Sequence, residues 1–265
     1  MTPVSGKSFD PVADGYDASR SLPEPLMAKT VTALATVLDA GTPVLEVGVG
    51  TGRFALALRD RGVRVIGVDI AERMLGKARE KGGEDLVLGT ATALPFRNRA
   101  FRSSLAIHVL HLIADWRRVL SEVSRVTTDR FVTLLEVITT RALDADETPP
   151  PGHGPGDVYH PIRRYEALAA RWGYRYEHPG VRPPQMIARM PPDIRVPVGR
   201  HSEVVPGETL LAPAASRSYS SQWAVPDDVH AKVMDLLTRE MVGHDFERTW
   251  EIEVIAWPPD ALRGM

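Results

Sequence analysis

Residues 44–69 have the types and spacing of a nucleoside-binding site. An apolar run with one acid, VLEV, precedes glycines at alternate positions, Gly48, Gly50 and Gly52. Glycines in such a turn allow a tight chain reversal and let a ligand approach the backbone at a helix N-terminus. A second apolar run, VRVIGVD, ends in Asp69, 17 residues after Gly52. A carboxylate at that position can accept hydrogen bonds from both hydroxyls of a ribose.

The glycine spacing argues against a pyrophosphate ligand. A dinucleotide-binding loop reads G-x-G-x-x-G, whereas this chain reads E-x-G-x-G-x-G from Glu46 to Gly52. The early third glycine suits a ligand that has no phosphate. Glu46 would repel a pyrophosphate and attract an ammonium group. The loop therefore favours a nucleoside cofactor that carries an amino group.

Together with the segment GTATALPF at 89–96, the loop and Asp69 resemble the class I S-adenosylmethionine-dependent methyltransferases. In its overall sequence pattern the chain is similar to the group of small-molecule methyltransferases that contains the quinone C-methyltransferases. The resemblance covers residues 9–138 and extends only loosely to the remainder. It implies S-adenosyl-L-methionine as cofactor, S-adenosyl-L-homocysteine as product, and in-line transfer of a methyl group to a small aromatic or apolar metabolite. O-, N- and C-methylation all stay open.

The resemblance also implies which residues contact the cofactor. Tyr16 and Arg20, in a lid formed by residues 9–23, would reach the methionine carboxylate, although Arg20 could instead form a surface ion pair. Thr90 stands where related enzymes have an acid, so its bond to the adenine amino group would lack charge assistance. Met74 could equally be a core residue. The implied set is Tyr16, Arg20, Glu46, Gly48, Gly50, Gly52, Asp69, Ile70, Met74, Thr90, Ala91, Leu94, Ile107 and His108.

Methyl transfer from a sulfonium needs no acid or base as a rule, because the cofactor carries the activated group. His108 and His111 are the candidates for a general base, since histidine titrates near neutral pH. Either could instead be a structural hydrogen-bonding residue. Tyr159 and His160 are candidates for substrate contact. We expect no metal site, because the histidines lack neighbouring paired acids and the chain has no cysteine.

Alternating strands and helices must position these residues. This alternation of strands and helices along the chain predicts a parallel sheet covered by helices on both faces. Ligands are expected at the carboxyl ends of the strands. Strict alternation in the first half of TWEIEVIAW predicts a final, antiparallel edge strand. The expected fold is a Rossmann-like doubly wound α/β fold with a mostly parallel seven-stranded sheet. Strands are predicted at residues 44–47, 63–69, 86–88, 101–107 and 131–138. The segment RSYSSQW at 217–223 is also compatible with a strand.

Residues 1–138 and 214–265 are expected to form the cofactor-binding core. Between them, residues 139–213 are rich in proline, including PPPGHGPG, and carry one clear helix at 161–172. We interpret this segment as a substrate-side cap inserted after strand five. A dimerisation arm or a loose excursion is the alternative.

Composition narrows the function classes. The chain has 265 residues, 43% of them hydrophobic, which is enough for a full core. A formal net charge of -2 and the lack of a basic stripe argue against a nucleic-acid partner. No apolar run has the length of a signal peptide or a membrane span. We expect a cytoplasmic monomer or homodimer whose partner is a small-molecule methyl acceptor.

Two other functions are compatible with parts of the pattern. A non-catalytic partner or sensor protein would bind S-adenosylmethionine without transferring a methyl group. A nicotinamide-dependent oxidoreductase would need a dinucleotide site, which the glycine spacing and Glu46 disfavour.

Overall fold

The computed structural model describes residues 8–39, 41–143 and 160–265. The strands are β1 (Val44–Val47), β2 (Val65–Asp69), β3 (Leu86–Leu88), β4 (Phe101–Leu105), β5 (Thr127–Ala142), β6 (Ile194–Pro206) and β7 (Asp245–Trp257). The α-helices are α1 (Tyr16–Arg20), α2 (Glu24–Leu38), α3 (Arg53–Arg59), α4 (Glu72–Glu80), α5 (Trp116–Val126), α6 (Pro161–Ala169), α7 (Pro183–Arg189), α8 (Gly207–Ala215) and α9 (Asp227–Met241). The short 3-10 helices are η1 (Asp10–Gly15), η2 (Leu110–Leu112), η3 (Ala170–Trp172), η4 (Ser220–Gln222) and η5 (Pro259–Gly264).

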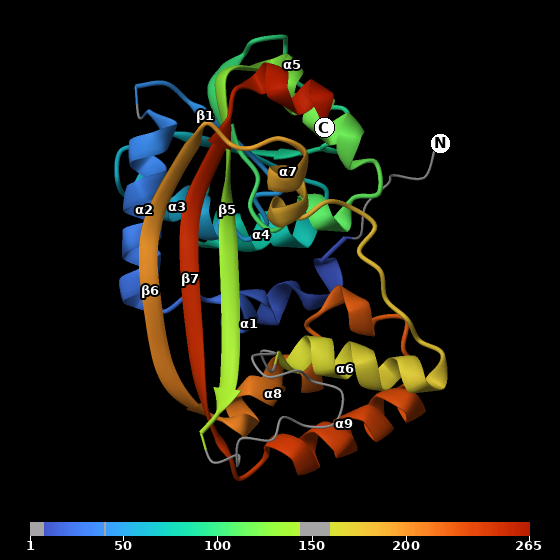
Figure 1. The fold of residues 1–265 in the computed structure, drawn as a ribbon. Helices are drawn as coiled ribbons and strands as arrows, with labels where there is room; N and C mark the ends of the chain where they lie inside the picture. Colours follow the sequence, from blue (N-terminus) through green and yellow to red (C-terminus); the bar gives the residue numbers. More distant parts are fainter. Residues whose placement is uncertain (1–7, 40, 144–159) are drawn as a thin grey trace. The chain divides into compact units, whose positions relative to one another are not determined.

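The strands form one seven-stranded sheet in the order β3-β2-β1-β4-β5-β7-β6 (Figure 1). The pairs β1–β2, β2–β3, β1–β4 and β4–β5 are parallel. The chain moves outward from β1 to β3, then returns to pair β4 on the other side of β1. This reversal is the switch point at which ligands bind in doubly wound sheets. The predicted Rossmann-like fold is confirmed.

β7 is antiparallel to its neighbours, as predicted. Leu143 of the chain following β5 donates its N–H to the carbonyl of Asp245, while Arg141 pairs with Glu247, so residue numbers run in opposite directions along the two strands. Its position differs from the expectation, because β7 lies one strand inside the edge and β6 forms the edge. β6 contains Pro197 and Gly199, residues that an edge strand tolerates.

The chain divides into two compact units. Unit 1 comprises residues 1–135, 178–199 and 252–265, and unit 2 comprises residues 136–177 and 200–251. The boundaries differ from the expected ones, since residues 178–199 belong to the same unit as residues 1–135 and residues 214–251 do not. Strands β5, β6 and β7 each have residues in both units.

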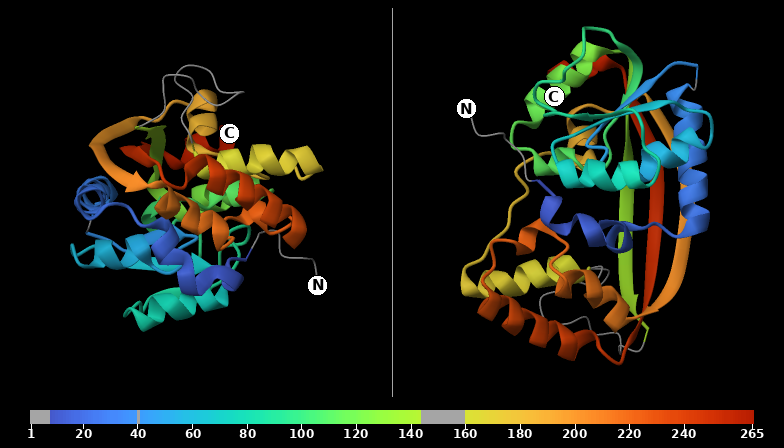
Figure 2. Two further views of the ribbon diagram at one scale, coloured as in Figure 1. Left: turned by 90° about the horizontal axis from the view of Figure 1, so that it is seen from below. Right: turned by 180° about the vertical axis from the view of Figure 1, so that it is seen from behind.

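Unit 2 has its own hydrophobic core, which explains why it separates. Helices α6, α8 and α9 contact one another (Figure 2). Tyr165, Leu210, Val233 and Leu237 from these helices are buried in one cluster. The sequence pattern of α9 was read correctly as a helix, but the apolar face of that helix packs on α6, within the residues expected to form the cap.

The segment RSYSSQW is not a strand, contrary to the expectation. It forms a turn and η4, because its side chains bond to the nearby backbone instead of joining a ladder. Gln222 donates through Nε2 to the carbonyl of Ala214 at 2.8 Å, and Trp223 donates through Nε1 to that of Arg217 at 3.0 Å.

Unit 1 holds the larger core. Leu45 and Val47 of β1, Phe131 of β5 and Trp257 of β7 are buried in one cluster together with the apolar face of α5. Over the described ranges, no helix has the length and apolarity needed to cross a membrane.

Candidate functional site

The glycine loop between β1 and α3 has the geometry that its sequence predicts. Gly48, Gly50 and Gly52 have φ angles of +74°, +56° and +78°, in the left-handed region that favours glycine. A Cβ atom on Gly48 would lie 2.6 Å from Cγ2 of Val109. At this position a side chain is therefore excluded by space as well as by backbone conformation.

Asp69 ends β2 directly beside this loop. Its Oδ2 accepts a hydrogen bond from the N–H of Gly50 at 2.8 Å, and its Oδ1 accepts one from the N–H of Ala71 at 2.9 Å. Burial raises the pKa of Asp69, while these backbone hydrogen bonds oppose the rise. The carboxylate is thus fixed between the two β–α corners, and each oxygen retains a lone pair for a ligand.

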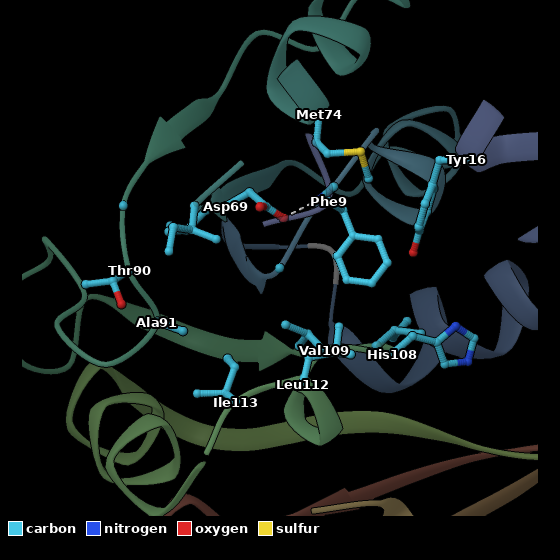
Figure 3. Close-up of a pocket in the computed structure, with 16 residues that line it drawn as sticks. Phe9, Tyr16, Asp69, Met74, Thr90, Ala91, His108, Val109, Leu112 and Ile113 are labelled. Carbon is cyan, nitrogen blue, oxygen red and sulfur yellow. Dashed lines mark hydrogen bonds between the residues drawn. The ribbon is translucent and has the colours of Figure 1, made fainter. Parts of the chain in front are cut away.

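A cavity in unit 1 lies at these corners (Figure 3). From the residues predicted to bind the cofactor, its lining includes Tyr16, Gly48, Gly50, Asp69, Ile70, Met74, Thr90, Ala91, Ile107 and His108. The sequence analysis did not identify the remaining lining residues, which are Phe9, Val68, Gly89, Val109, Leu112 and Ile113. Most of these residues are apolar and lie close in the sequence to a residue that was predicted to line the site. This closeness in sequence is the signal that could have identified them.

Phe9 and Tyr16 cover the cavity. They belong to residues 9–23, which are called the covering segment below. Their rings meet edge to face with centroids 5.8 Å apart, and both pack on Met74. The ring of Phe9 lies between Met74 and Val109 in Figure 3. The remaining cavity volume is about 80 Å³, whereas small-molecule sites span roughly 300–1,000 Å³. An adenosyl amino acid could therefore enter only if this segment shifts.

Ion pairs attach the covering segment to α4, beside which it lies (Figure 2). Asp14 pairs with Lys77 at 3.0 Å, and Asp17 pairs with Lys81 at 2.7 Å. Asp17 also accepts a 2.5 Å hydrogen bond from the hydroxyl of Thr51 in the glycine loop. The covering segment is thus attached to both corners that frame the cavity.

The loop after β3 is held by a carboxylate and a guanidinium from α5. Glu122 is buried and accepts the N–H of Leu94 at 2.9 Å, and Arg125 donates to Glu122 and to the carbonyls of Leu94 and Phe96. Arg125 lowers the pKa of Glu122. Leu94 is buried in the core of unit 1 and does not line the cavity described above. Thr90 does line it, and its hydroxyl lies 2.8 Å from that of Thr92.

Glu46 is 3% exposed and lies in β1, behind the cavity lining. Its carboxyl group accepts a hydrogen bond from the backbone of Ala55, while Oε2 has no hydrogen-bond partner among the described residues. Burial raises the pKa of Glu46 to about 8, against the lowering effect of the Arg53 charge. Glu46 is therefore a buried, mostly protonated acid at neutral pH, although the sequence suggested an anionic entrance.

His108 follows β4 with a φ of +56°, which is unusual for a residue with a side chain. Its backbone lines the cavity, and its imidazole points away from Phe9 in Figure 3. Nδ1 lies 3.3 Å from Nη2 of Arg53, and Arg53 also donates to the carbonyl of Arg20. Arg53 thus links α3, the covering segment and the end of β4. The sequence analysis did not identify Arg53 as a site residue.

His111 and Arg20 do not line the cavity described above. His111 lies in η2, and its ring contacts that of His178 edge to face at 5.1 Å. Burial, with the nearby cationic groups of His178, His108, Arg182 and Arg20, lowers the pKa of His111 to about 3. It is neutral at physiological pH, and so weak a base suits proton abstraction poorly. Gly52, also outside the lining, is the N-cap residue of α3.

Of the two residues predicted to contact substrate, Tyr159 and His160, the structure describes only His160. Tyr159 lies outside the described residues, as does His153. His160 lies in unit 2 as the N-cap residue of α6. The described part of the chain contains no group of three or more His, Cys, Asp or Glu side chains that could hold a metal ion.

Comparison with known proteins identifies the domain around the cavity. Residues 45–130 match a family model described as a methyltransferase domain. A biotin biosynthesis bifunctional protein from Cellvibrio japonicus is 34% identical over 122 residues, which are 45% of this chain and 24% of that protein. A demethylmenaquinone methyltransferase from Renibacterium salmoninarum is 33% identical over 126 residues, which are 45% of this chain and 52% of that protein. The chain thus spans about a quarter and about half of the length of these relatives.

The fold also matches solved structures. A proposed methyltransferase from an antibiotic biosynthesis pathway of Anabaena variabilis has a TM-score of 0.51 and 17% identity, covering 83% of this chain and 96% of that one. At this identity the likeness concerns the fold. It extends over most of both units.

Proposed function

We infer that this chain, whose residues 45–130 belong to the methyltransferase domain family, is an S-adenosylmethionine-dependent methyltransferase that acts on a small molecule. The observation that carries the proposal is the cavity at the switch point of the sheet. It brings together Gly50, Asp69 and Thr90, which lie at the carboxyl ends of three different strands and which the sequence analysis assigned to one cofactor. The family implies S-adenosylmethionine as that cofactor.

The donor set of the cavity fits an adenosyl amino acid. Asp69 would accept hydrogen bonds from the ribose hydroxyls, and Ile70, Met74 and Ala91 offer apolar and backbone contacts to a flat base. No basic side chain lines the cavity apart from His108, so a pyrophosphate would have no counter-charge there. Glu46 does not line the cavity, but its Oε2 has no hydrogen-bond partner among the described residues, and an ammonium group near β1 would favour its ionised form.

The cofactor, when bound, supplies a methyl group already activated on a sulfonium. The protein then has to orient the acceptor and exclude water. Phe9 and Tyr16 would exclude water from the covered side of the cavity. Val109, Leu112 and Ile113 form an apolar wall of the same cavity. Such a wall suits an aromatic or apolar acceptor, and one relative is named for demethylmenaquinone. No base is required for an acceptor that loses its proton to solvent.

The ribose assignment is tested by calorimetric titration of S-adenosylhomocysteine into wild type and Asp69→Ala. We expect binding to weaken by about 2 to 4 kcal/mol, because ribose hydroxyls would lose a charged partner in a buried site. This corresponds to roughly 30- to 1,000-fold in Kd. Asp85→Ala is the control, since Asp85 forms an exposed ion pair with Arg64. Equal affinity in wild type and Asp69→Ala would refute the assignment.

Catalysis is tested separately from binding. Labelled methyl groups from S-adenosylmethionine should appear in one member of a panel of small quinols, phenols and carboxylic acids. Tight binding of the cofactor without any methyl transfer to such acceptors or to a metabolite extract would instead support the sensor alternative. Binding of NADH, followed by its fluorescence, would support the oxidoreductase alternative.

A further inference from the structure

A second cavity of unit 1 lies where β4 and β5 begin, at the opposite ends of these strands from the cofactor cavity. Its volume is about 210 Å³, and its walls come from the turn before β4, the C-terminal end of α5 and η5. We propose that this cavity binds the phosphate group of a small molecule through Arg99, Arg263 and Ser124. The inference does not depend on the proposed function. The name basic cavity is used below for this site.

Contacts with α5 fix the turn that carries Arg99. Arg99 has a φ of +55°, which is unusual for a residue with a side chain, and its N–H donates to the carbonyl of Arg125 at 2.9 Å. Arg125 in turn donates through Nη1 to Oδ1 of Asn98 at 3.0 Å and to the carbonyl of Phe96 at 2.7 Å. The turn is therefore attached to α5 through both backbone and side chains, and this attachment keeps Arg99 in the wall of the basic cavity.

The opposite wall comes from η5, which is attached to the same helix. Arg263 donates through Nε to Oγ of Ser124 at 2.9 Å, and Ser124 is 3% exposed. The hydroxyl of Ser124 accepts this bond and keeps its own proton for a ligand. Apart from Nε, the guanidinium of Arg263 donates no hydrogen bond to another described residue. A buried hydroxyl and a partly used guanidinium thus lie side by side in the lining.

Positive charge is in excess around the basic cavity, because three arginines and one acidic residue line it. Arg125 already pairs with Glu122 at 2.7 Å and offsets the partial negative charge at the end of α5. Arg263 lies 3.5 Å from the carboxylate of Asp260, but both side chains are largely exposed, so solvent screens this pair. The side chain of Arg99 forms no hydrogen bond or ion pair with any described residue. Arg99 therefore has a full charge to offer to an anion.

A phosphate group matches these donors in charge and in direction. Its oxygens point to the corners of a tetrahedron, so it can accept hydrogen bonds from Arg99, Arg263 and Ser124, which come from three different segments. A carboxylate has only two oxygens, both in one plane, and an ammonium group would be repelled. The cavity is also smaller than the roughly 300–1,000 Å³ of sites for drug-sized ligands, which suits a small anion.

The proposal is tested by titrating inorganic phosphate and phenyl phosphate into the protein, followed by phosphorus NMR at an ionic strength held constant with chloride. We expect saturable binding that weakens at least about tenfold in Arg99→Gln and in Arg263→Gln, since each loses a charge-assisted hydrogen bond. Acetate should displace phosphate at least about tenfold less well than phenyl phosphate does. The matched control is Arg97→Gln, because Arg97 is exposed and close in sequence but does not line the basic cavity. It should keep the wild-type affinity.

Thermal unfolding establishes that each variant is folded, and the exposed Arg99→Gln serves if Arg263→Gln is not. Tighter binding of phenyl phosphate would identify a phosphate monoester as the ligand, and tighter binding of inorganic phosphate would identify the free ion; both support the site. No saturable binding of either probe would overturn the proposal. So would an equal loss of affinity in Arg97→Gln, which indicates diffuse surface charge, or equal displacement by acetate. Displacement of phosphate by S-adenosylhomocysteine would place the phosphate in the cofactor cavity and would also overturn it.

Discussion

Replacing Glu46 by glutamine should make the stability of the protein less dependent on pH. The carboxyl group is 3% exposed, and its Oε2 has no hydrogen-bond partner among the described residues. Burial raises its pKa from 4.5 to about 8 in the folded protein. An unfolded chain would ionise this group near its ordinary pKa, so the two states bind different numbers of protons between these values.

The sign and the magnitude follow from this difference. Below about pH 4.5 the carboxyl is protonated in both states and costs no stability. As pH rises from 4.5 toward 8, the unfolded state loses the proton of Glu46 while the folded state retains it, so the free energy of unfolding falls. Above pH 8 the loss is complete and amounts to at most about 5 kcal/mol, from 1.36 kcal/mol per pKa unit. Glutamine cannot ionise, so Glu46→Gln removes this loss.

Urea unfolding followed by circular dichroism at pH 5, 7 and 9 measures the effect. The stability of Glu46→Gln relative to wild type should increase by several kcal/mol from pH 5 to pH 9. The amide adds an unsatisfied buried donor that costs about 1–3 kcal/mol, but this cost is the same at each pH. The difference between the two proteins, rather than either absolute value, therefore carries the result. Parallel dependence on pH in both proteins would show that Glu46 is ionised when folded.

Three other outcomes are expected from the same contacts. Glu122→Gln should destabilise the protein by about 1–3 kcal/mol at pH 7, measured by urea unfolding, because Arg125 loses a buried charged partner. Since the pKa of Glu122 is lowered in the folded state, this contribution is present above its unfolded pKa and should vanish as pH falls through the folded value. Tyr16→Ala should speed dissociation of S-adenosylhomocysteine in stopped-flow measurements while the melting temperature of the unliganded protein stays nearly constant; a large fall would mean that Tyr16 supports the core. The C2 proton of His111 should not titrate by NMR between pH 5 and 8, because its pKa is about 3, and a midpoint near 6.5 would contradict the burial argument.

The sequence predicted the parts of the site that depend on local geometry. The left-handed φ angles of Gly48, Gly50 and Gly52 follow from the residue type and the tight turn, and a strand ending in Asp69 places its carboxylate at the same sheet edge. Parallel strands align their carboxyl ends, so the segment after β3 also had to reach this edge. These inferences need only hydrophobic periodicity and the residue types of turns, both of which can be read from residues close together in the sequence.

Contacts between distant segments were not accessible in the same way. His178 and Gly180 lie about 70 residues from His111 in the sequence, and only the tertiary path of the chain across η2 brings them together. The boundaries of the two units differ from the expected ones, because the apolar face of α9 indicates that the helix is buried but not which element it packs against. Arg53 was overlooked for a related reason, since its partners His108 and Arg20 come from other elements.

The contacts that frame the cavity differ in strength, and this difference bears on access. Asp69 is fixed by two backbone N–H groups, and the glycine loop by its dihedral angles and the close approach of Val109, so this side of the cavity has little freedom. The covering segment is attached by apolar packing and also by ion pairs at the surface, such as Asp14 with Lys77 and Asp17 with Lys81. Exposed ion pairs contribute little stability and are screened by salt. Opening of the covering segment would break these ion pairs and the packing of Phe9 and Tyr16, but it would leave the bonds of Asp69 intact, so the cofactor would enter a preorganised cavity.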